Sequence, residues 1–213
     1  MLKRVLIFFI AGLRFATAAE EESRTQTTAQ SGPKPIAAEN KDPIEHCEYI
    51  FETGIIWKLG GGATPLAYTV MPQILTIKLP AAFRGTFAGG DLILRQRFSL
   101  LLEPIIKGPE THYLGVSGSG SIEWWNHPRT TSVFFASGGG FGGMNSKGYE
   151  IKGAQGQDLN FNWFIYSGAQ KSWNPRLSTS LGLYFQHISN ASLDRVNPGL
   201  NALGPMIGLV YRY

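Results

Sequence analysis

Apolar and polar positions alternate along most of the chain beyond residue 48. Short runs rich in Leu, Val, Ile and aromatic residues place an apolar side chain at every second position, and Gly, Pro, Asn and Ser separate the runs. From Tyr49 onward, no run repeats its apolar residues with the spacing of an amphipathic helix. Successive side chains of a strand point to opposite faces, so the pattern predicts a succession of two-faced β-strands.

The pattern predicts eight strands in an all-β fold. They are spaced by about twenty residues, and short turns between them favour antiparallel neighbours. The predicted strands cover residues 49–59, 65–79, 91–102, 112–125, 129–141, 158–167, 176–189 and 202–213.

Two features favour a transmembrane β-barrel over residues 48–213 rather than a soluble sandwich, which remains the alternative fold. Apolar faces carry Trp, Tyr and Phe near the strand ends, as interface girdles do. The opposite faces carry charged groups, among them Arg95, Arg97, Glu103 and Glu123. We expect these four to pair with one another inside a narrow lumen, because side chains fill the interior of a small barrel.

The N-terminus has the features of a secretory signal peptide. Two basic residues precede the apolar run 5–13, which is too short to span a bilayer, and the small residues 16–19 suit cleavage. We therefore expect residues 1–19 to be removed. Arg14 interrupts the pattern and leaves a retained N-terminal anchor as the alternative.

Residues 20–47 are rich in Glu, Thr, Ser, Ala, Lys and Pro, which predicts a flexible N-terminal arm. Cleavage after residue 19 would leave sixteen basic against fifteen acidic side chains, so charge does not support a nucleic-acid partner. Cys47 is the single cysteine, which excludes an internal disulfide. The histidines lack metal-ligand spacing within one element, and we expect neither a metal nor a cofactor.

The seventh predicted strand carries the strongest candidate chemistry. Leu181, Leu183, Phe185, His187 and Ser189 lie two residues apart and share one face. Two positions along a strand span roughly 6.6 Å, a gap that an imidazole and a serine hydroxyl can close. A potential base and a potential nucleophile therefore end an apolar stripe. The alternative interpretation is an interface histidine beside a serine at the start of a loop.

These residue types suit acyl transfer. Serine becomes a nucleophile when a neighbouring base takes its proton, and an oxyanion needs hydrogen-bond donors. His187 would be the base for Ser189, and Asn190 with nearby backbone N–H groups would supply the donors. If both ends of the barrel lie in the periplasm, the pair faces lipid at the outer leaflet. This placement predicts hydrolysis of an ester presented sideways from the membrane.

The segment His187–Ala191, followed by Asn197–Asn201, resembles the lipid A 3-O-deacylases. The resemblance is specific over residues 181–213. It implies an eight-stranded barrel of the cell outer membrane, and a serine hydrolase without a cofactor. Its substrate would be lipid A of lipopolysaccharide in the outer leaflet, from which it removes the ester-linked 3-O-acyl chain. It also implies His187 as base, Ser189 as nucleophile and Asn190 as oxyanion donor.

One position departs from that family. Its third member is typically a glutamate, and the residue twelve positions after Ser189 is Asn201. An amide can orient an imidazole but cannot supply the negative charge that stabilises an imidazolium, so reduced activity or a different ester is expected. Asp194, in the preceding loop, is the alternative acid. A non-enzymatic structural or adhesive barrel remains the alternative function, and monomer and dimer remain open.

Overall fold

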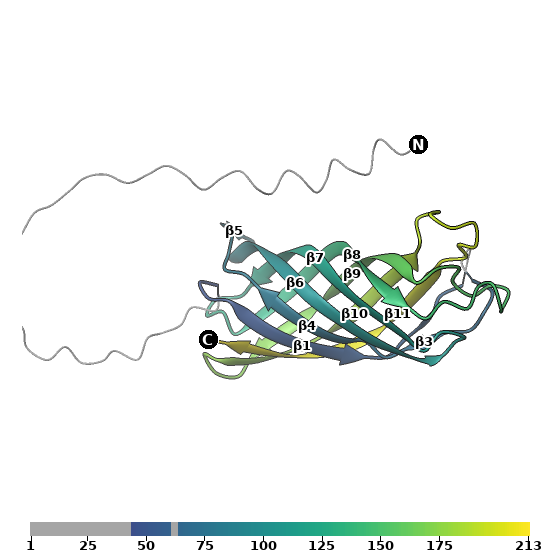
Figure 1. Ribbon diagram of the computed structural model, residues 1–213. Coiled ribbons are helices and arrows are strands. Elements are labelled where there is room, and N and C mark those ends of the chain that lie inside the picture. Colours follow the sequence, from purple (N-terminus) through teal and green to yellow (C-terminus); the bar gives the residue numbers. More distant parts are fainter. Residues whose placement is uncertain (1–43, 61–63) are drawn as a thin grey trace, which may run out of the picture. The chain divides into compact units, whose positions relative to one another are not determined.

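The computed structural model describes residues 44–60 and 64–213, and the regular secondary structure of these residues consists of β-strands (Figure 1). The strands are β1 (Glu48–Gly54), β2 (Ile56–Lys58), β3 (Thr69–Val70), β4 (Gln73–Lys78), β5 (Phe83–Phe87), β6 (Gly90–Lys107), β7 (His112–Trp125), β8 (Thr131–Met144), β9 (Leu159–Ser172), β10 (Leu177–Ser189) and β11 (Leu200–Arg212).

These segments close into a barrel of eight antiparallel strands. β1 with β2 makes the first barrel strand, β3 with β4 the second, and β6 to β11 the other six. β6 to β11 pair in sequence order, and β1 closes the circle by pairing with both β4 and β11. The predicted all-β, eight-stranded antiparallel barrel is confirmed.

Proline interrupts the first two barrel strands, which the sequence pattern predicted to be continuous. Pro72 has no N–H to donate and lies in the gap between β3 and β4. The gap between β1 and β2 falls at Ile55, whose N–H donates to the carbonyl of Pro205. The unpredicted strand β5 pairs with β6 and extends that hairpin to a turn at Ala88 and Gly89, both of which have positive φ.

Charged side chains fill one part of the barrel interior. Glu48 is fully buried and is surrounded by Lys78 at 2.6 Å, Arg212 at 2.7 Å and Arg95 at 3.2 Å. Lys78 also reaches Glu123 at 2.8 Å. Each of these buried charges therefore has an opposite charge within contact distance, as a low-dielectric interior requires.

The expected lumen residues are inside the barrel, but their expected pairing was wrong. Arg97 pairs with Glu52 at 2.7 Å, and Glu103 accepts a hydrogen bond from Gln186 at 3.1 Å. These partners lie on β1 and β10, neither of which pairs with β6, rather than at the neighbouring positions of β6 and β7. Strand alternation determines the face of each residue but does not determine which strands meet across the interior.

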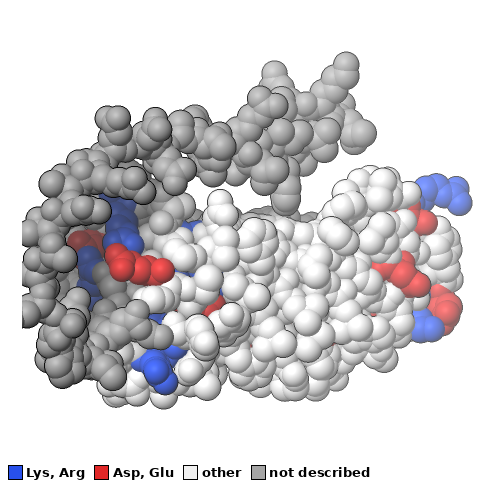
Figure 2. All heavy atoms as spheres, turned by 60° about the vertical axis from the view of Figure 1, so that its left-hand side comes forward, with Lys and Arg blue, Asp and Glu red and all other residues white. Residues whose placement is uncertain are grey.

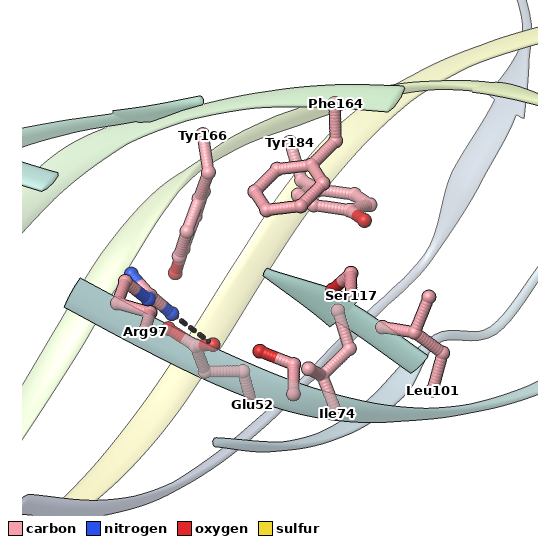
Figure 3. A pocket seen from close by; sticks show the side chains of 9 residues that line it. Glu52, Ile74, Arg97, Leu101, Ser117, Phe164, Tyr166 and Tyr184 are labelled. Carbon is pink, nitrogen blue, oxygen red and sulfur yellow. Dashed lines mark hydrogen bonds and ion pairs between the residues drawn. The ribbon is translucent and has the colours of Figure 1, made fainter. Parts of the chain in front are cut away.

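The interior is packed rather than open. A cavity of about 10 Å³, enough for a single water molecule, lies between the Arg97–Glu52 ion pair and the rings of Phe164, Tyr166 and Tyr184 (Figure 3). Apolar side chains, including Ile56, Leu101, Met144, Ile188 and Met206, form a buried core cluster, and Leu101 also lines the cavity.

The outer surface of the barrel is apolar. Large hydrophobic side chains such as Phe98, Leu183 and Ile207 are more than half exposed. Figure 2 shows a broad zone without charged groups between two ends that carry them. An apolar zone of this kind is typical of a transmembrane barrel. Among the residues that the structure describes, there is no helix long and apolar enough to cross a membrane.

The two ends of the barrel differ. The barrel begins at Glu48 and finishes at Arg212 at one end, called here the terminal end, which also holds the β7–β8 and β9–β10 turns (Figure 1). The opposite end, called here the loop end, holds the β2–β3, β6–β7, β8–β9 and β10–β11 connections. The last of these, residues 190–199, is called here the last loop.

The expected signal peptide 1–19 and most of the expected arm 20–47 lie outside the described residues. The described end of the arm is packed: Ile44 is fully buried, and its carbonyl accepts from the N–H of Ala81 at 3.0 Å. Glu45 forms an exposed ion pair with Arg84 at 3.2 Å. The packed segment therefore begins at least four residues before the predicted barrel boundary.

Candidate active site

The alternation of β10 continues to its last residue and places His187 and Ser189 on the outer wall. Tyr184, Gln186 and Ile188 are buried in the interior, so the intervening positions face outward. His187 and Ser189 are both half-buried. They lie at the loop end, where β10 turns into the last loop.

Three side chains form a hydrogen-bonded array. His187 Nε2 lies 3.0 Å from Ser189 Oγ, and His187 Nδ1 lies 2.6 Å from Asn201 Oδ1. His187 and Asn201 are direct register partners on β10 and β11. Because an amide oxygen can only accept, Nδ1 carries the proton in this arrangement, and Nε2 is left to accept the serine hydroxyl proton. This is the tautomer that a general base requires.

Asp194, the alternative acid, is engaged elsewhere. Its carboxylate accepts from the Tyr149 hydroxyl at 2.8 Å and from the Val196 N–H at 2.7 Å. The hydrogen bond to Asp194 raises the pKa of the Tyr149 phenol. Of the two candidates for the third member, the structure therefore places Asn201, and not Asp194, against the imidazole.

Asn190 points away from Ser189 and organises the last loop. Its side chain is fully buried, with Nδ2 donating to the Val196 carbonyl and Oδ1 accepting from the Ser192 N–H, each at 3.0 Å. Its own N–H donates to Asn197 at 3.0 Å. The geometry does not favour the side chain of Asn190 as an oxyanion donor.

The backbone after Asn190 offers another donor. Ala191 and Ser192 both have positive φ, at 52° and 64°, and turn the chain directly after the serine strand. The Ser192 N–H is occupied by Asn190, whereas the Ala191 N–H has no acceptor among the described residues. A backbone N–H without an acceptor among the described residues therefore lies two residues after Ser189.

Two further residues contact the imidazole and were not identified from the sequence. Trp163 on β9 is the register partner of His187, and the two ring centroids lie 5.9 Å apart. Gly199 has φ of +67°, and a Cβ there would lie 3.2 Å from Cε1 of His187. The short β9–β10 turn was the available signal for Trp163, because it determines the register of that hairpin.

The side chains around His187 can exchange a proton, but they are not a set that ligates a metal ion. Among the described residues, no group of three or more His, Cys, Asp or Glu side chains is placed to hold a metal ion. The array at His187 consists of one imidazole, one hydroxyl and one amide.

The fold and the site together define a class of protein: a closed eight-stranded barrel with an apolar outer surface, carrying a serine–histidine pair on its outer wall. The family model described as lipid A 3-O-deacylase (PagL) matches residues 82–210. The chain belongs to this family.

A solved structure has the same fold. It is described as the crystal structure of the outer membrane enzyme PagL, and it aligns with a TM-score of 0.53 at 17% sequence identity. The alignment covers 77% of this chain and 98% of that chain. Comparison of the sequence with curated proteins finds no match.

Proposed function

We propose that this protein is an outer-membrane serine esterase that removes the ester-linked 3-O-acyl chain from lipid A of lipopolysaccharide. The observation that carries the proposal is the hydrogen-bonded Ser189–His187–Asn201 array on the apolar outer wall of the barrel. Membership of the lipid A 3-O-deacylase family supports the substrate class. The site opens toward the surrounding lipid, so a membrane-embedded ester can reach it without leaving the bilayer.

The mechanism follows from the two nitrogen positions of the imidazole. Nε2 takes the hydroxyl proton while Ser189 Oγ attacks the ester carbonyl, and the charge on the carbonyl oxygen is stabilised by backbone N–H groups of the last loop. The C–O bond to the sugar then breaks as the imidazolium protonates the departing 3-oxygen, which leaves as the 3-hydroxyl, and the acyl group stays on Ser189. Water, deprotonated by His187, hydrolyses this acyl-enzyme and releases the fatty acid.

Orientation in the membrane follows if the terminal end lies in the periplasm. The loop end then reaches the outer leaflet, where the lipid A phosphates lie. Lys107, Lys152 and Arg195 are exposed there and would contact anionic headgroups. Glu150 and Asp158 are also exposed at this end, so the charge of the rim by itself does not select an anionic partner.

The proposal is tested with purified protein and lipopolysaccharide in detergent, with lipid A analysed by mass spectrometry. The expected result is loss of one 3-hydroxyacyl chain from lipid A. Ser189→Ala and His187→Ala should each reduce the rate by at least about 10³-fold. Ser167→Ala, which alters an exposed serine on β9, is the matched control and should keep the parent rate. A heat-modifiable gel shift verifies that each variant is folded.

A parent protein that releases no acyl chain from lipid A would refute the deacylase. Folding and membrane insertion in the same preparation would then favour the structural or adhesive barrel. Equal rates for the parent and Ser189→Ala would refute the serine mechanism instead.

A further inference from the structure

The imidazole of His187 has a neutral partner where a carboxylate would stabilise its charged form. Asn201 accepts the Nδ1 proton at 2.6 Å but carries no negative charge. The proposed mechanism nevertheless forms an imidazolium in each of its two steps. Some other group in contact with the ring must favour that cation if the reaction is to proceed at a useful rate.

The indole of Trp163 lies against the imidazole. The two ring centroids are 5.9 Å apart with an interplanar angle of 33°, which is a tilted arrangement. A tryptophan face attracts a cation within about 6 Å of its centroid, and more strongly where water is excluded. The side chain is 46% exposed on the outer wall, where the solvent of a membrane-embedded barrel is lipid rather than water.

Neighbouring packing holds the indole in this position. Trp163 also contacts Phe185, the outward residue before His187 on β10, with ring centroids 5.1 Å apart. The β9–β10 pairing sets Trp163 directly opposite His187. The indole is thus fixed by a strand register and by a second aromatic ring, so its approach to the imidazole does not depend on a flexible loop.

No ionisable side chain competes for this role among the described neighbours of the ring. The imidazole faces Ser189 on β10, Asn201 on β11, Trp163 on β9 and Gly199 of the last loop. Three charged groups at the same end of the barrel are directed or bonded elsewhere. Lys58 pairs in register with the inward-facing Ala202, Asp158 accepts from the Ser146 N–H, and Asp194 is held by Tyr149.

We propose that Trp163 is a positioning residue that acts through His187: its indole face stabilises the imidazolium and in part replaces the missing carboxylate. This inference rests on the proposed esterase function. A contact of this kind corresponds to about a 5- to 30-fold gain in rate.

The test compares Trp163→Leu and Trp163→Phe with the parent across pH. Trp163→Leu removes the aromatic face and should lower the plateau of kcat/KM by about 5- to 30-fold. It should also move the acidic limb of the rate profile to lower pH, because without the indole the imidazole stays neutral, and able to act as a base, down to a lower pH. Trp163→Phe retains a weaker aromatic face, so its kcat/KM plateau and its acidic limb should lie between those of the parent and of Trp163→Leu. Trp173→Leu makes the same change at an exposed tryptophan of the terminal end and should match the parent.

A second measurement does not need turnover. In folded Ser189→Ala protein in micelles, NMR follows the titration of the His187 imidazole with and without Trp163→Leu. The midpoint should move to lower pH when the indole is removed. A lower plateau with no change in the acidic limb or in the NMR midpoint would mean that Trp163 only packs, and would overturn the inference. If the parent hydrolyses no lipid A but the midpoint still moves, the esterase proposal fails and the ring contact stands.

Discussion

Asn201 is the position at which the site can be altered with the least change in shape. Its amide oxygen lies 2.6 Å from Nδ1 of His187, and Asn201→Asp places a carboxylate oxygen at the same point. Asn201→Glu would supply the residue typical of the family, but its extra methylene has to bend to reach the same distance. Asn201→Asp therefore isolates the effect of charge on the imidazole.

The expected gain follows from the change in hydrogen-bond type. A hydrogen bond to a charged group contributes about 1–2 kcal/mol more than one between neutral groups. The difference applies to the imidazolium formed in the transition state and converts to roughly 5- to 30-fold in kcat/KM. The same charge favours the imidazolium in the resting protein, so the acidic limb of the profile should move to higher pH and the gain should shrink in acid.

The assay measures acyl-chain release from lipopolysaccharide in detergent over a range of pH, with Asn201→Leu as the opposite control. Removing the acceptor leaves the tautomer unspecified, and Asn201→Leu should lower the rate by about tenfold or more. Nitrogen NMR shifts of the neutral form of the parent imidazole should show its proton on Nδ1. An unchanged or lower plateau in Asn201→Asp would refute the argument that charge at this position limits the reaction.

Two further predictions concern packing and the last loop. Gly140→Ala should destabilise the barrel, because its Cβ would overlap the Val116 carbonyl oxygen. Gly143→Ala is the control, since a Cβ at Gly143 has nothing within 4 Å. Denaturant unfolding in micelles should show a lower stability for Gly140→Ala than for Gly143→Ala. Tyr149→Phe removes the hydrogen bond to Asp194 and should speed tryptic cleavage of the last loop. Because that bond raises the pKa of the Tyr149 phenol, the parent loop should keep its protection up to strongly alkaline pH and lose it as the phenol ionises. Equal cleavage of parent and variant would mean that the bond does not hold the loop.

Much of the barrel could be predicted because strand alternation is local. The face of each residue depends only on its position relative to its neighbours, so the outward direction of His187 and Ser189 and the interior positions of Arg95 and Arg97 follow from counting by two. The breaks within the first two barrel strands were harder to predict from the sequence. Pro72 breaks one predicted strand visibly, whereas the gap at Ile55 arises only where β1 and β2 meet Pro205.

Contacts between strands distant in sequence depended on register. The sequence left Asn201 and Asp194 as alternatives, because a ten-residue loop separates β10 from β11 and hides which residue faces His187. Register places Asn201 directly opposite, and the loop directs Asp194 to Tyr149. Register also explains the pairing of charged side chains in the interior. Arg97 contacts Glu52 on the first barrel strand rather than a neighbour on β7.

The amino-acid sequence by itself determined a two-faced strand pattern, the shared outward face of His187 and Ser189, and the neutral residue at the position of the expected acid. These depend on spacing within one strand, which the geometry of the extended backbone dictates. Only the tertiary structure decided that Asn201 orients the imidazole and that Trp163 lies against it. Closure of the barrel sets the register of all eight strands together, and register alone brings residues from β9, β10 and β11 to one point.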